Sequence, residues 1–490
     1  MPAKKTNDSN TSKATWKAQG GKLFANRPLL READPAVDRV EAGASFDTQD
    51  AAPAQLRMDA LSTSRATDAE SFTAPMAGTA NWTPLGPLVI PNGQTYSAAR
   101  VNVSGRITAI AIDPLAPLTI YAGSAQGGVW KTTDGGANWA PMSDNQASLA
   151  IGAVILDPNN PQTIYAATGE GNFSADSYYG LGVLKSIDGG SNWTLNGAST
   201  FAGKRFCRLA IHASNSSLIL AAVSNGIHRS TNAGVAWAPL AGGLPSANAT
   251  EVAFDPGNGN VAYAAFYGNG IYKSTNVTAA APAWTKLAGG LPTTQLGRIV
   301  LAVSPSSPST LYALIGNGKT DNIDRFYVSN NAGANWSAIP LPGGNIGGQS
   351  FYNIHLTVDP TTPDIVYLCG ISFWKAVRSG AAWSITDLGG AFHPDCHVSA
   401  IDPSNHLTIY AGSDGGIYRS TMLSSATEVR AARSSSDWRQ SACTSKFSWK
   451  CATRCWISSV PTSSRSAASS STSSSSMWPP KTAHWSVRSE

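Results

Sequence analysis

Acidic and aromatic side chains gather in the segment TGEGNFSADSYYGLG, residues 168–182. Its carboxylates, Glu170 and Asp176, can serve as an acid and a base, and Tyr178 and Tyr179 offer flat surfaces for stacking. Carboxylates beside aromatic platforms are what a glycosidase or a sugar-binding cleft needs. The structural alternative is that Glu170 caps the loop backbone while the tyrosines pack between neighbouring repeats.

A second cluster, AFHPDCH at residues 391–397, is rich in metal-ligand side chains. His393, Asp395 and His397 alternate along it, and alternate residues of an extended segment point to the same side. Two imidazoles and a carboxylate are ligands of first-row metals, and Asp414 of GSDGG is a candidate fourth ligand. A divalent metal is therefore the one cofactor that the sequence suggests. The alternatives are an acid–base pair and hydrogen bonds that hold this junction together.

We group these side chains by the role expected of them. The catalytic candidates are Glu170, Asp176 and Asp414. The ligand-binding candidates are Tyr178, Tyr179, Arg325 and Tyr352. Arg325 ends the charged segment GNGKTDNIDR at 316–325, for which a solvated surface loop is the alternative interpretation.

A repeat must position these clusters. TTDGGANW at 132–139 returns as SIDGGSNW at 186–193, and weaker copies follow. The tryptophans that close the copies recur roughly every 45–55 residues, a period that indicates propeller or solenoid units. They are Trp139, Trp193, Trp237, Trp284, Trp336 and Trp383.

The residue types of the repeat indicate a structural turn. Asp134 and Asp188 can accept backbone N–H groups within the turn, and the glycines supply positive φ angles. Trp139 and Trp193 bury large apolar surfaces that hold the hairpin down. We therefore interpret these four residues as structural rather than catalytic.

Each repeat contains four short strands, as in RITAIAID, TIYAGSA, GVWKTT and NWAPM between residues 106 and 142. Seven first strands are expected, near Arg106–Asp113, Ile151–Asp157, Arg208–His212, Glu251–Asp255, Arg298–Ser304, Ile354–Asp359 and Val398–Asp402. The sequence thus predicts an all-β fold, a seven-bladed β-propeller of four-stranded antiparallel blades.

The seventh repeat reaches GIYRST at 416–421 without a recognisable fourth strand, whereas NWTPLG at 81–86 has the sequence of a spare fourth strand. We expect this N-terminal strand to pair into the last blade and close the ring, because closure removes an exposed sheet edge.

The chain is expected to divide into a disordered leader at 1–80, the propeller at 81–421 and a disordered tail at 422–490. The chain has 46 glycines, yet none lies between 421 and 490, where serine dominates. Two interpretations of the tail stay open: a low-complexity segment, or a sequence read out of frame shortly after Thr421.

Composition excludes several classes of function. The net charge of +5 arises from the tail, so the rest of the chain is close to neutral and no nucleic-acid partner is expected. The chain lacks an apolar run long enough for a membrane span and an N-terminal secretory signal. The cysteines stand singly, which indicates no disulfide framework and no thiolate metal site. We expect a monomer.

TTDGGANW and SIDGGSNW resemble the Asp-box (BNR) repeats of the propeller superfamily that includes sialidases, sortilin-type proteins and xyloglucanases. GGVWKTTDGG, TGEGN, HPDCH and GSDGG together resemble bacterial BNR-repeat proteins often labelled glycosyl hydrolases. The resemblance implies that the functional face lies opposite the Asp-containing turns. It also implies an extracytoplasmic location, which the missing export signal opposes, so the compartment stays open.

Features of the enzymes in this superfamily are only partly present. Arg106, Arg208 and Arg298 begin first strands, but Ile107 and Thr108 follow Arg106, where sialidases have Ile-Pro. Ala125 occupies the position of the catalytic aspartate of xyloglucanases. The first expectation is thus a non-catalytic propeller that binds a glycan or a protein partner through its loop face. The alternative is a glycoside hydrolase that uses carboxylates of that face.

Overall fold

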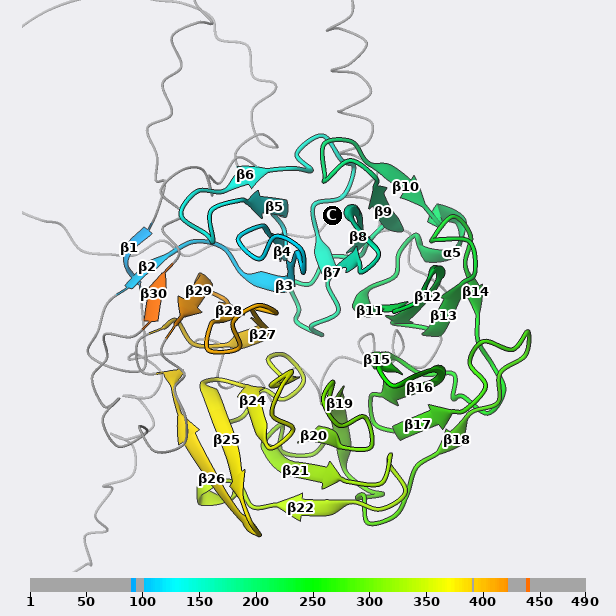
Figure 1. Ribbon diagram of the computed structural model, residues 1–490, viewed down its shortest axis with the longest axis vertical. Coiled ribbons are helices and arrows are strands. Elements are labelled where there is room, and N and C mark those ends of the chain that lie inside the picture. The colour runs from blue at the N-terminus through cyan, green and yellow to red at the C-terminus, as the bar shows by residue number, and fades with distance from the viewer. Residues whose placement is uncertain (1–89, 94–100, 390–391, 422–437, 441–490) are drawn as a thin grey trace, which may run out of the picture. The chain divides into compact units, whose positions relative to one another are not determined.

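The computed structural model describes residues 90–93, 101–389, 392–421 and 438–440. The chain divides into two compact units, Met1–Ser448 and Trp449–Glu490, and all described residues belong to the first. Seven four-stranded antiparallel sheets follow one another around a ring (Figure 1). The predicted seven-bladed propeller is confirmed.

The strands of the first four blades follow in chain order. The first blade contains β3 (Ile107–Ile112), β4 (Ile120–Ser124), β5 (Gly128–Thr132) and β6 (Ala140–Pro141). The second contains β7 (Ile151–Asp157), β8 (Asn160–Thr168), β9 (Val183–Ser186) and β10 (Thr194–Asn196). The third contains β11 (Phe206–His212), β12 (Asn215–Val223), β13 (Gly226–Ser230) and β14 (Ala238–Pro239). The fourth contains β15 (Ala249–Asp255), β16 (Asn258–Phe266), β17 (Gly270–Ser274) and β18 (Thr285–Lys286).

Three further blades complete the ring. The fifth contains β19 (Leu296–Val303), β20 (Leu311–Asn317), β21 (Ile323–Ser329) and β22 (Ser337–Ile339). The sixth contains β23 (His355–Val358), β24 (Ile365–Cys369), β25 (Phe373–Ser379) and β26 (Ala382–Asp387). The seventh contains β27 (Cys396–Ile401), β28 (Ile409–Ser413), β29 (Gly416–Ser420) and β30 (Trp438–Gln440). The other elements are β1 (Ile90–Gly93), β2 (Val101–Val103), the short helix α5 (Ala198–Phe201) and the 3-10 turn η2 (Pro342–Gly344).

The first strand of each blade is innermost, and the second strand lies in the core. In β4 and β28, which share the sequence IYAGS, all five residues are buried. Neighbouring blades cover both faces of a blade, so its second strand must be apolar on both sides. This packing accounts for the repeated small and apolar residues that the sequence shows in the second strands.

The Asp-containing turn is a compact hydrogen-bonded unit. One carboxylate oxygen of Asp134 accepts from Thr132 Oγ1 at 2.6 Å and from the Asn138 backbone N–H at 2.9 Å. These bonds lower the pKa of Asp134 to about 2. Gly135 and Gly136 have φ angles of 69° and 97°, which other residues rarely adopt. The carboxylate is fully engaged in shaping the turn.

Side chains of the preceding blade also donate hydrogen bonds to several of these turns. Tyr121 and Lys131 of the first blade both donate to one glycine carbonyl in the turn of the second, at 3.1 and 3.0 Å. At the seam of the ring, Tyr410 and Arg419 of the seventh blade donate to the Gly135 carbonyl of the first blade, at 3.5 and 3.1 Å. Side chains of the repeat itself therefore help to join the seventh blade to the first and close the propeller.

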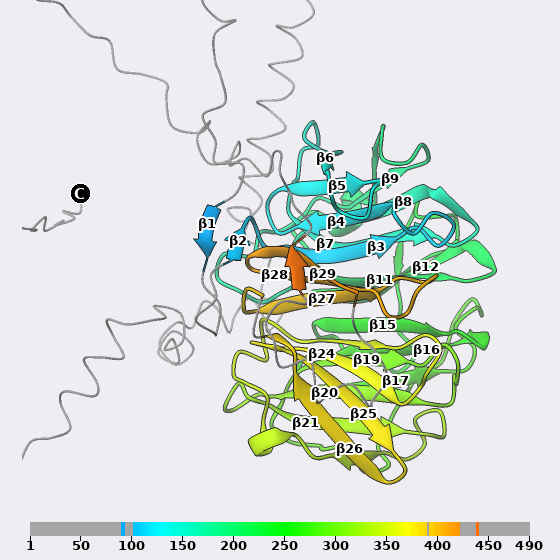
Figure 2. The same ribbon diagram turned by 60° about the vertical axis from the view of Figure 1, so that its left-hand side comes forward.

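The predicted closing strand is corrected by the structure. The fourth strand of the seventh blade is β30, which pairs antiparallel with β29 (Figure 1). It belongs to the segment 422–490, which was expected to be disordered, whereas the predicted strand at 81–86 lies outside the described residues. The edge of β29 can pair with any extended backbone. The similarity of NWTPLG to the other fourth strands was therefore not sufficient to predict which segment pairs with β29. Figure 2 shows β1 and β2 beside the same blade.

A disulfide joins the sixth and seventh blades, although the spacing of the cysteines along the chain indicated no disulfide framework. Cys369 ends β24, Cys396 begins β27, and their Cα atoms are 5.0 Å apart. The two cysteines are 27 residues apart in the chain, and only the stacking of the blades brings them together. Within the described residues no helix is both long and apolar enough to cross a membrane.

Replacing Cys369 and Cys396 together by serine is expected to lower the free energy of unfolding by about 2–3 kcal/mol, because the cross-link restricts the unfolded chain. Urea unfolding of the wild type and the double variant, each with and without dithiothreitol, checks this. The reductant should bring the wild type to the level of the variant and leave the variant unchanged. A fully reduced wild type that unfolds at the original midpoint would contradict the prediction.

Candidate ligand-binding site at the loop face

Different turns and loops lie at the two ends of the propeller. The Asp-containing turns meet the turns between first and second strands, as the 2.9 Å bond from the Gly135 N–H to the Leu118 carbonyl shows. Loops between second and third strands and between blades emerge at the other end. The segment between β8 and β9, the entry to β27 and the β28–β29 turn belong to this loop face.

A closed ring of hydrogen-bonded side chains lies where these loops meet. Its six members come from four blades, and each contacts the next around the ring. In order, they are Glu170, Arg106, Tyr352, Asp414, His397 and Asn172. The structure thus unites two of the predicted catalytic residues, one predicted ligand-binding residue and one predicted metal ligand.

Arg106 organises one half of the ring. Its Nε lies 2.9 Å from Glu170 Oε1 and its Nη2 donates to Glu170 Oε2 at 3.0 Å. Its Nη1 donates to the Tyr352 hydroxyl at 2.6 Å, and that hydroxyl donates to Asp414 Oδ1 at 2.7 Å. Asp176, the third predicted catalytic residue, accepts from the same guanidinium at 3.2 Å from outside the ring.

Asn172 organises the other half. Its Oδ1 accepts from Arg298 Nη1 at 3.2 Å, so its amide nitrogen faces Glu170 Oε1 at 3.0 Å and His397 Nδ1 at 3.2 Å. Because an amide nitrogen only donates, His397 Nδ1 accepts. Its Nε2 then carries the proton and donates to Asp414 Oδ1 at 2.8 Å.

The surroundings of the two carboxyl groups in the ring shift their pKa values in opposite directions. Burial raises the pKa of Glu170, despite the opposing charge of Arg106. Burial also opposes ionisation of Asp414, but the contacts with His397, Arg106 and Tyr352 outweigh it and lower the pKa of Asp414. Burial and the neighbouring Asp414 raise the pKa of the Tyr352 phenol. One carboxyl group therefore holds its proton more tightly than usual and the other less tightly.

Only part of this network is open to a ligand. The Glu170 side chain is 0 % exposed, whereas those of Arg106, Asp414 and Asp176 are 12 %, 28 % and 59 % exposed. Tyr178 is 44 % exposed. The parts of this network open to solvent are therefore the carboxylates of Asp176 and Asp414 and a small part of the Arg106 guanidinium.

Two of the predicted ligand-binding residues are held elsewhere. Arg325 forms an ion pair with Asp324 at 3.4 Å and donates to the carbonyls of Thr294 and Gln295. The guanidinium carbon of Arg205 lies over the Tyr179 ring, 4.9 Å from the ring centroid. Neither makes a contact with the ring in the part of the chain that the structure describes.

The predicted metal triad is corrected by the structure. His393 Nδ1 contacts the Pro394 carbonyl, Asp395 accepts from Asn353, and His397 belongs to the ring. Asp395 has a φ of 67°, so the segment is not extended there and its side chains do not alternate as predicted. No group of three or more metal-ligating side chains is found among the described residues.

Sequence reasoning missed the residues that connect the ring. Asn172 stands two positions after Glu170 in TGEGN, and Arg298 was considered only as a first-strand arginine. Arg106 bonds side chains 64 and 246 positions away. The motif TGEGN was the available signal for Asn172, while no spacing along the chain indicates the partners of Arg106.

The comparisons with known proteins concern the fold. No protein-family model matches the sequence, and no curated protein matches it. An ancestral GH74 enzyme matches with a TM-score of 0.52 and 19 % identity, over 69 % of this chain and 46 % of that one. The GH74 enzyme of Niastella koreensis gives 0.52 and 21 %, over 69 % and 55 %. The GH74 xyloglucanase of Xanthomonas campestris gives 0.53 and 20 %, over 67 % and 54 %.

This chain has the propeller fold found in these GH74 structures. It spans about half the length of each of them. At such identities the likeness extends to the architecture and not to individual site residues.

Proposed function

We propose that this propeller binds a carbohydrate at the mouth of its loop face, through Arg106, Asp176, Tyr178 and Asp414. The observation that supports this most is the pair of exposed carboxylates attached to a buried network. Asp176 and Asp414 accept hydrogen bonds from sugar hydroxyls, and Tyr178 offers a stacking face. Arg106 donates one bond to the sugar in place of one of its two 3.2 Å bonds to Asp176. The ring behind them holds Arg106 and Asp414 in fixed geometry, so little side-chain entropy is lost on binding.

Binding without catalysis fits the accessibility of the carboxyl groups. A glycosidase needs an acid and a second carboxylate that both reach one glycosidic bond. Glu170, the buried carboxyl whose raised pKa would suit an acid, is 0 % exposed and is paired with Arg106. It supports the site from behind and does not reach a ligand at the mouth.

The alternative function is glycoside hydrolysis by Asp176 and Asp414. Arg106 Nη1 contacts Asp176 at 3.2 Å and the Tyr352 hydroxyl at 2.6 Å, and this hydroxyl contacts Asp414 at 2.7 Å. The two carboxyl groups are therefore no more than about 9 Å apart, within the span of an acid–base pair that admits a water. The propeller fold shared with GH74 enzymes is compatible with this alternative.

Titration calorimetry with xyloglucan, cello- and chito-oligosaccharides is the test. We expect at least one class to bind and the affinity to fall about tenfold or more in Asp176→Asn and Tyr178→Ala, because each loses a direct contact. Asp324→Asn, in β21 of the fifth blade, serves as the matched control and should bind normally. Absence of binding across the panel, or equal affinities in all variants, would refute the proposal.

The same samples separate the two functions. Reducing-end analysis after long incubation should show intact oligosaccharides if the propeller only binds. Cleavage that disappears in both Asp176→Asn and Asp414→Asn would establish the hydrolase instead.

A further inference from the structure

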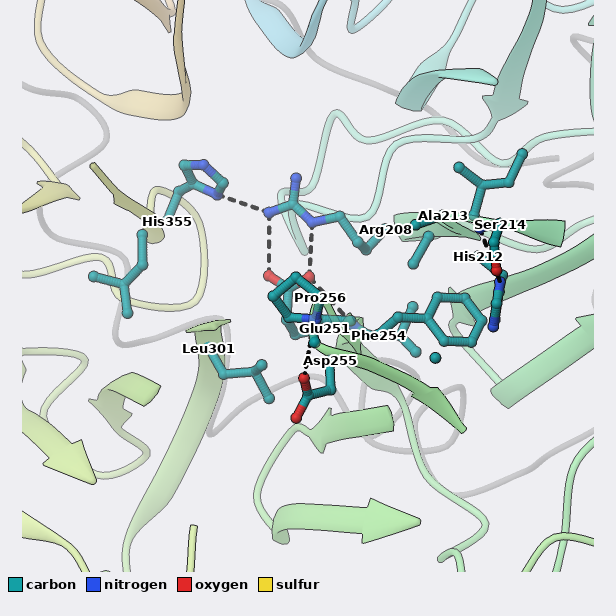
Figure 3. Close-up of a pocket in the computed structure, with 17 residues that line it drawn as sticks. Arg208, His212, Ala213, Ser214, Glu251, Phe254, Asp255, Pro256, Leu301 and His355 are labelled. Carbon is teal, nitrogen blue, oxygen red and sulfur yellow. Dashed lines mark hydrogen bonds and ion pairs between the residues drawn. The ribbon is translucent and has the colours of Figure 1, made fainter. Parts of the chain in front are cut away.

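A cavity of about 570 Å³ lies beside the innermost strands β11 and β15 of the third and fourth blades. Leu301 of β19 and His355 of β23 line it from the fifth and sixth blades. The side chains that line the cavity are drawn in Figure 3. Small-molecule sites in proteins typically have volumes of about 300–1,000 Å³. The cavity is therefore large enough for an organic ligand.

The cavity opens at the end of the propeller that carries the Asp-containing turns. Ser214, Pro256 and Gly257 line it, are exposed, and belong to turns between first and second strands. Such turns meet the Asp-containing turns at the end opposite the loop face. A ligand can therefore enter this cavity without passing the sugar-binding mouth, and the two sites are separate.

Much of the cavity wall is apolar. Phe254, Leu301 and Leu356 contribute large side chains to it. Ala210 of β11 and Ala253 of β15 also line it, and both are only partly buried. A mostly apolar wall with a few placed polar groups is typical of pockets that bind small organic molecules.

Arg208 offers a hydrogen-bond donor to this cavity. Its Nε and Nη2 donate to the two oxygens of Glu251 at 2.7 and 3.1 Å, and Nη2 also donates to His355 Nδ1 at 2.7 Å. Figure 3 shows Arg208 in contact with both residues. Its Nη1 has no hydrogen-bond partner within the described residues and remains accessible to solvent. An occupant with an acceptor oxygen can satisfy this donor.

The charges in the cavity wall disfavour an anion. Glu251 neutralises Arg208 through an ion pair of 2.7 Å. His355 and His212 each accept a hydrogen bond on Nδ1, so both imidazoles are neutral. Asp255 adds a second carboxylate. The residues that line the cavity thus carry one cationic group and two carboxylates.

We propose that this cavity binds an uncharged, mainly apolar organic molecule whose carbonyl oxygen accepts a hydrogen bond from Arg208 Nη1. The apolar walls bury the body of the molecule, and the ion pair with Glu251 fixes the guanidinium, so little side-chain entropy is lost on binding. This site does not depend on carbohydrate binding at the loop face.

Fluorescence titration of the full chain with Prodan, an uncharged naphthalene dye that carries a ketone, tests the proposal. Prodan should bind saturably, and the anionic dye anilinonaphthalene sulfonate should bind about tenfold more weakly or worse, because the wall carries a net negative charge. Ala253→Leu, which fills part of the cavity, should weaken Prodan binding about tenfold or more.

The matched control is Ala111→Leu in the innermost strand of the first blade. Ala111 pairs with Tyr121 as Ala253 pairs with Tyr263, but Ala111 does not line the cavity. This variant should bind Prodan as the wild type does. An affinity that falls equally in both alanine variants would show that the dye binds elsewhere, and would overturn the proposal.

A second variant tests the donor. Arg208→Gln combined with Glu251→Gln removes the guanidinium and its counter-charge together, so neither is left buried without a partner. Loss of the charged donor should weaken Prodan binding about tenfold, while urea unfolding verifies that the variant is folded. The proposal is also overturned by a wild type that does not bind Prodan, by equal affinity for the anionic dye, or by unchanged Prodan affinity in this double variant.

Discussion

Replacing Arg106 by glutamine is expected to lower the free energy of unfolding by about 3–5 kcal/mol at pH 8, because the substitution leaves a buried charge without its partner. That charge is Glu170, whose side chain is fully buried and contacts the guanidinium at 2.9 and 3.0 Å. Urea unfolding of the variant and the wild type measures the difference.

The pH dependence distinguishes this cause from a general packing defect. Burial already raises the pKa of Glu170 in the wild type, and loss of Arg106 raises it further. A carboxyl group with a raised pKa favours the folded state fully below its unfolded pKa of about 4.3, and this contribution is lost as the pH rises through the folded pKa. The variant should therefore lose less stability at pH 5 than at pH 8.

Two further variants control the measurement. Arg106→Gln combined with Glu170→Gln should recover much of the stability, because neither member of the buried pair then carries a charge. Arg325→Gln, at an ion pair near the surface, should cost little at either pH. An equal loss at pH 5 and pH 8 in Arg106→Gln would show that the charge of Glu170 is not responsible.

Acid is expected to destabilise the propeller through His228, by about 3 kcal/mol between pH 7 and pH 4. His228 lies in β13, is 2 % exposed and packs edge-on against Phe201, with ring centroids 5.0 Å apart. Burial lowers its pKa to about 4. Since its folded pKa lies below its unfolded value, the stability is fully present above about pH 6.5 and is lost as the pH falls toward 4.

Denaturant unfolding across this pH range checks the expectation. His228→Leu, which has no titrating group, should flatten most of the decline. His355, also buried with a strongly lowered pKa, should leave the variant some residual acid sensitivity. His212→Gln, at a partly exposed position, should decline as the wild type does. A His228→Leu curve as steep as that of the wild type would show that another group controls acid unfolding.

The repeat was predictable because its determinants are local. Strand alternation, the turn chemistry of Asp134 and the buried Trp139 all act within one blade, and each copy repeats the information. The seven first strands and the seven blades were therefore correctly predicted. The closing strand was not, because the edge of β29 selects only an extended backbone, and β30 comes from a segment with no sign of the repeat.

The residue types of the site were predictable from the sequence, but the hydrogen-bond partners of these residues were not. Glu170, Asp176 and Asp414 stood out as carboxylates on loops, and one hydrogen-bonded network around Arg106 connects all three, with Glu170 buried behind the other two. The alternation of His393, Asp395 and His397 predicted a metal triad on an extended segment, but the segment is not extended at Asp395, which has a φ of 67°. A single residue in the left-handed region interrupts the extended geometry on which alternation depends, and spacing along the chain does not reveal it.

The sequence by itself determined the architecture, because blade formation depends on short-range hydrogen bonding and burial that recur in every repeat. Only the tertiary structure decided which side chains share a site. Closure of the propeller brings Arg106 of the first blade against Tyr352 of the sixth, and it connects Asn172 of the second blade with His397 of the seventh. It also buries Arg298 with no carboxylate within ion-pair distance among the described residues. Such pairings depend on distances across the channel, and a linear sequence does not encode them in any local pattern.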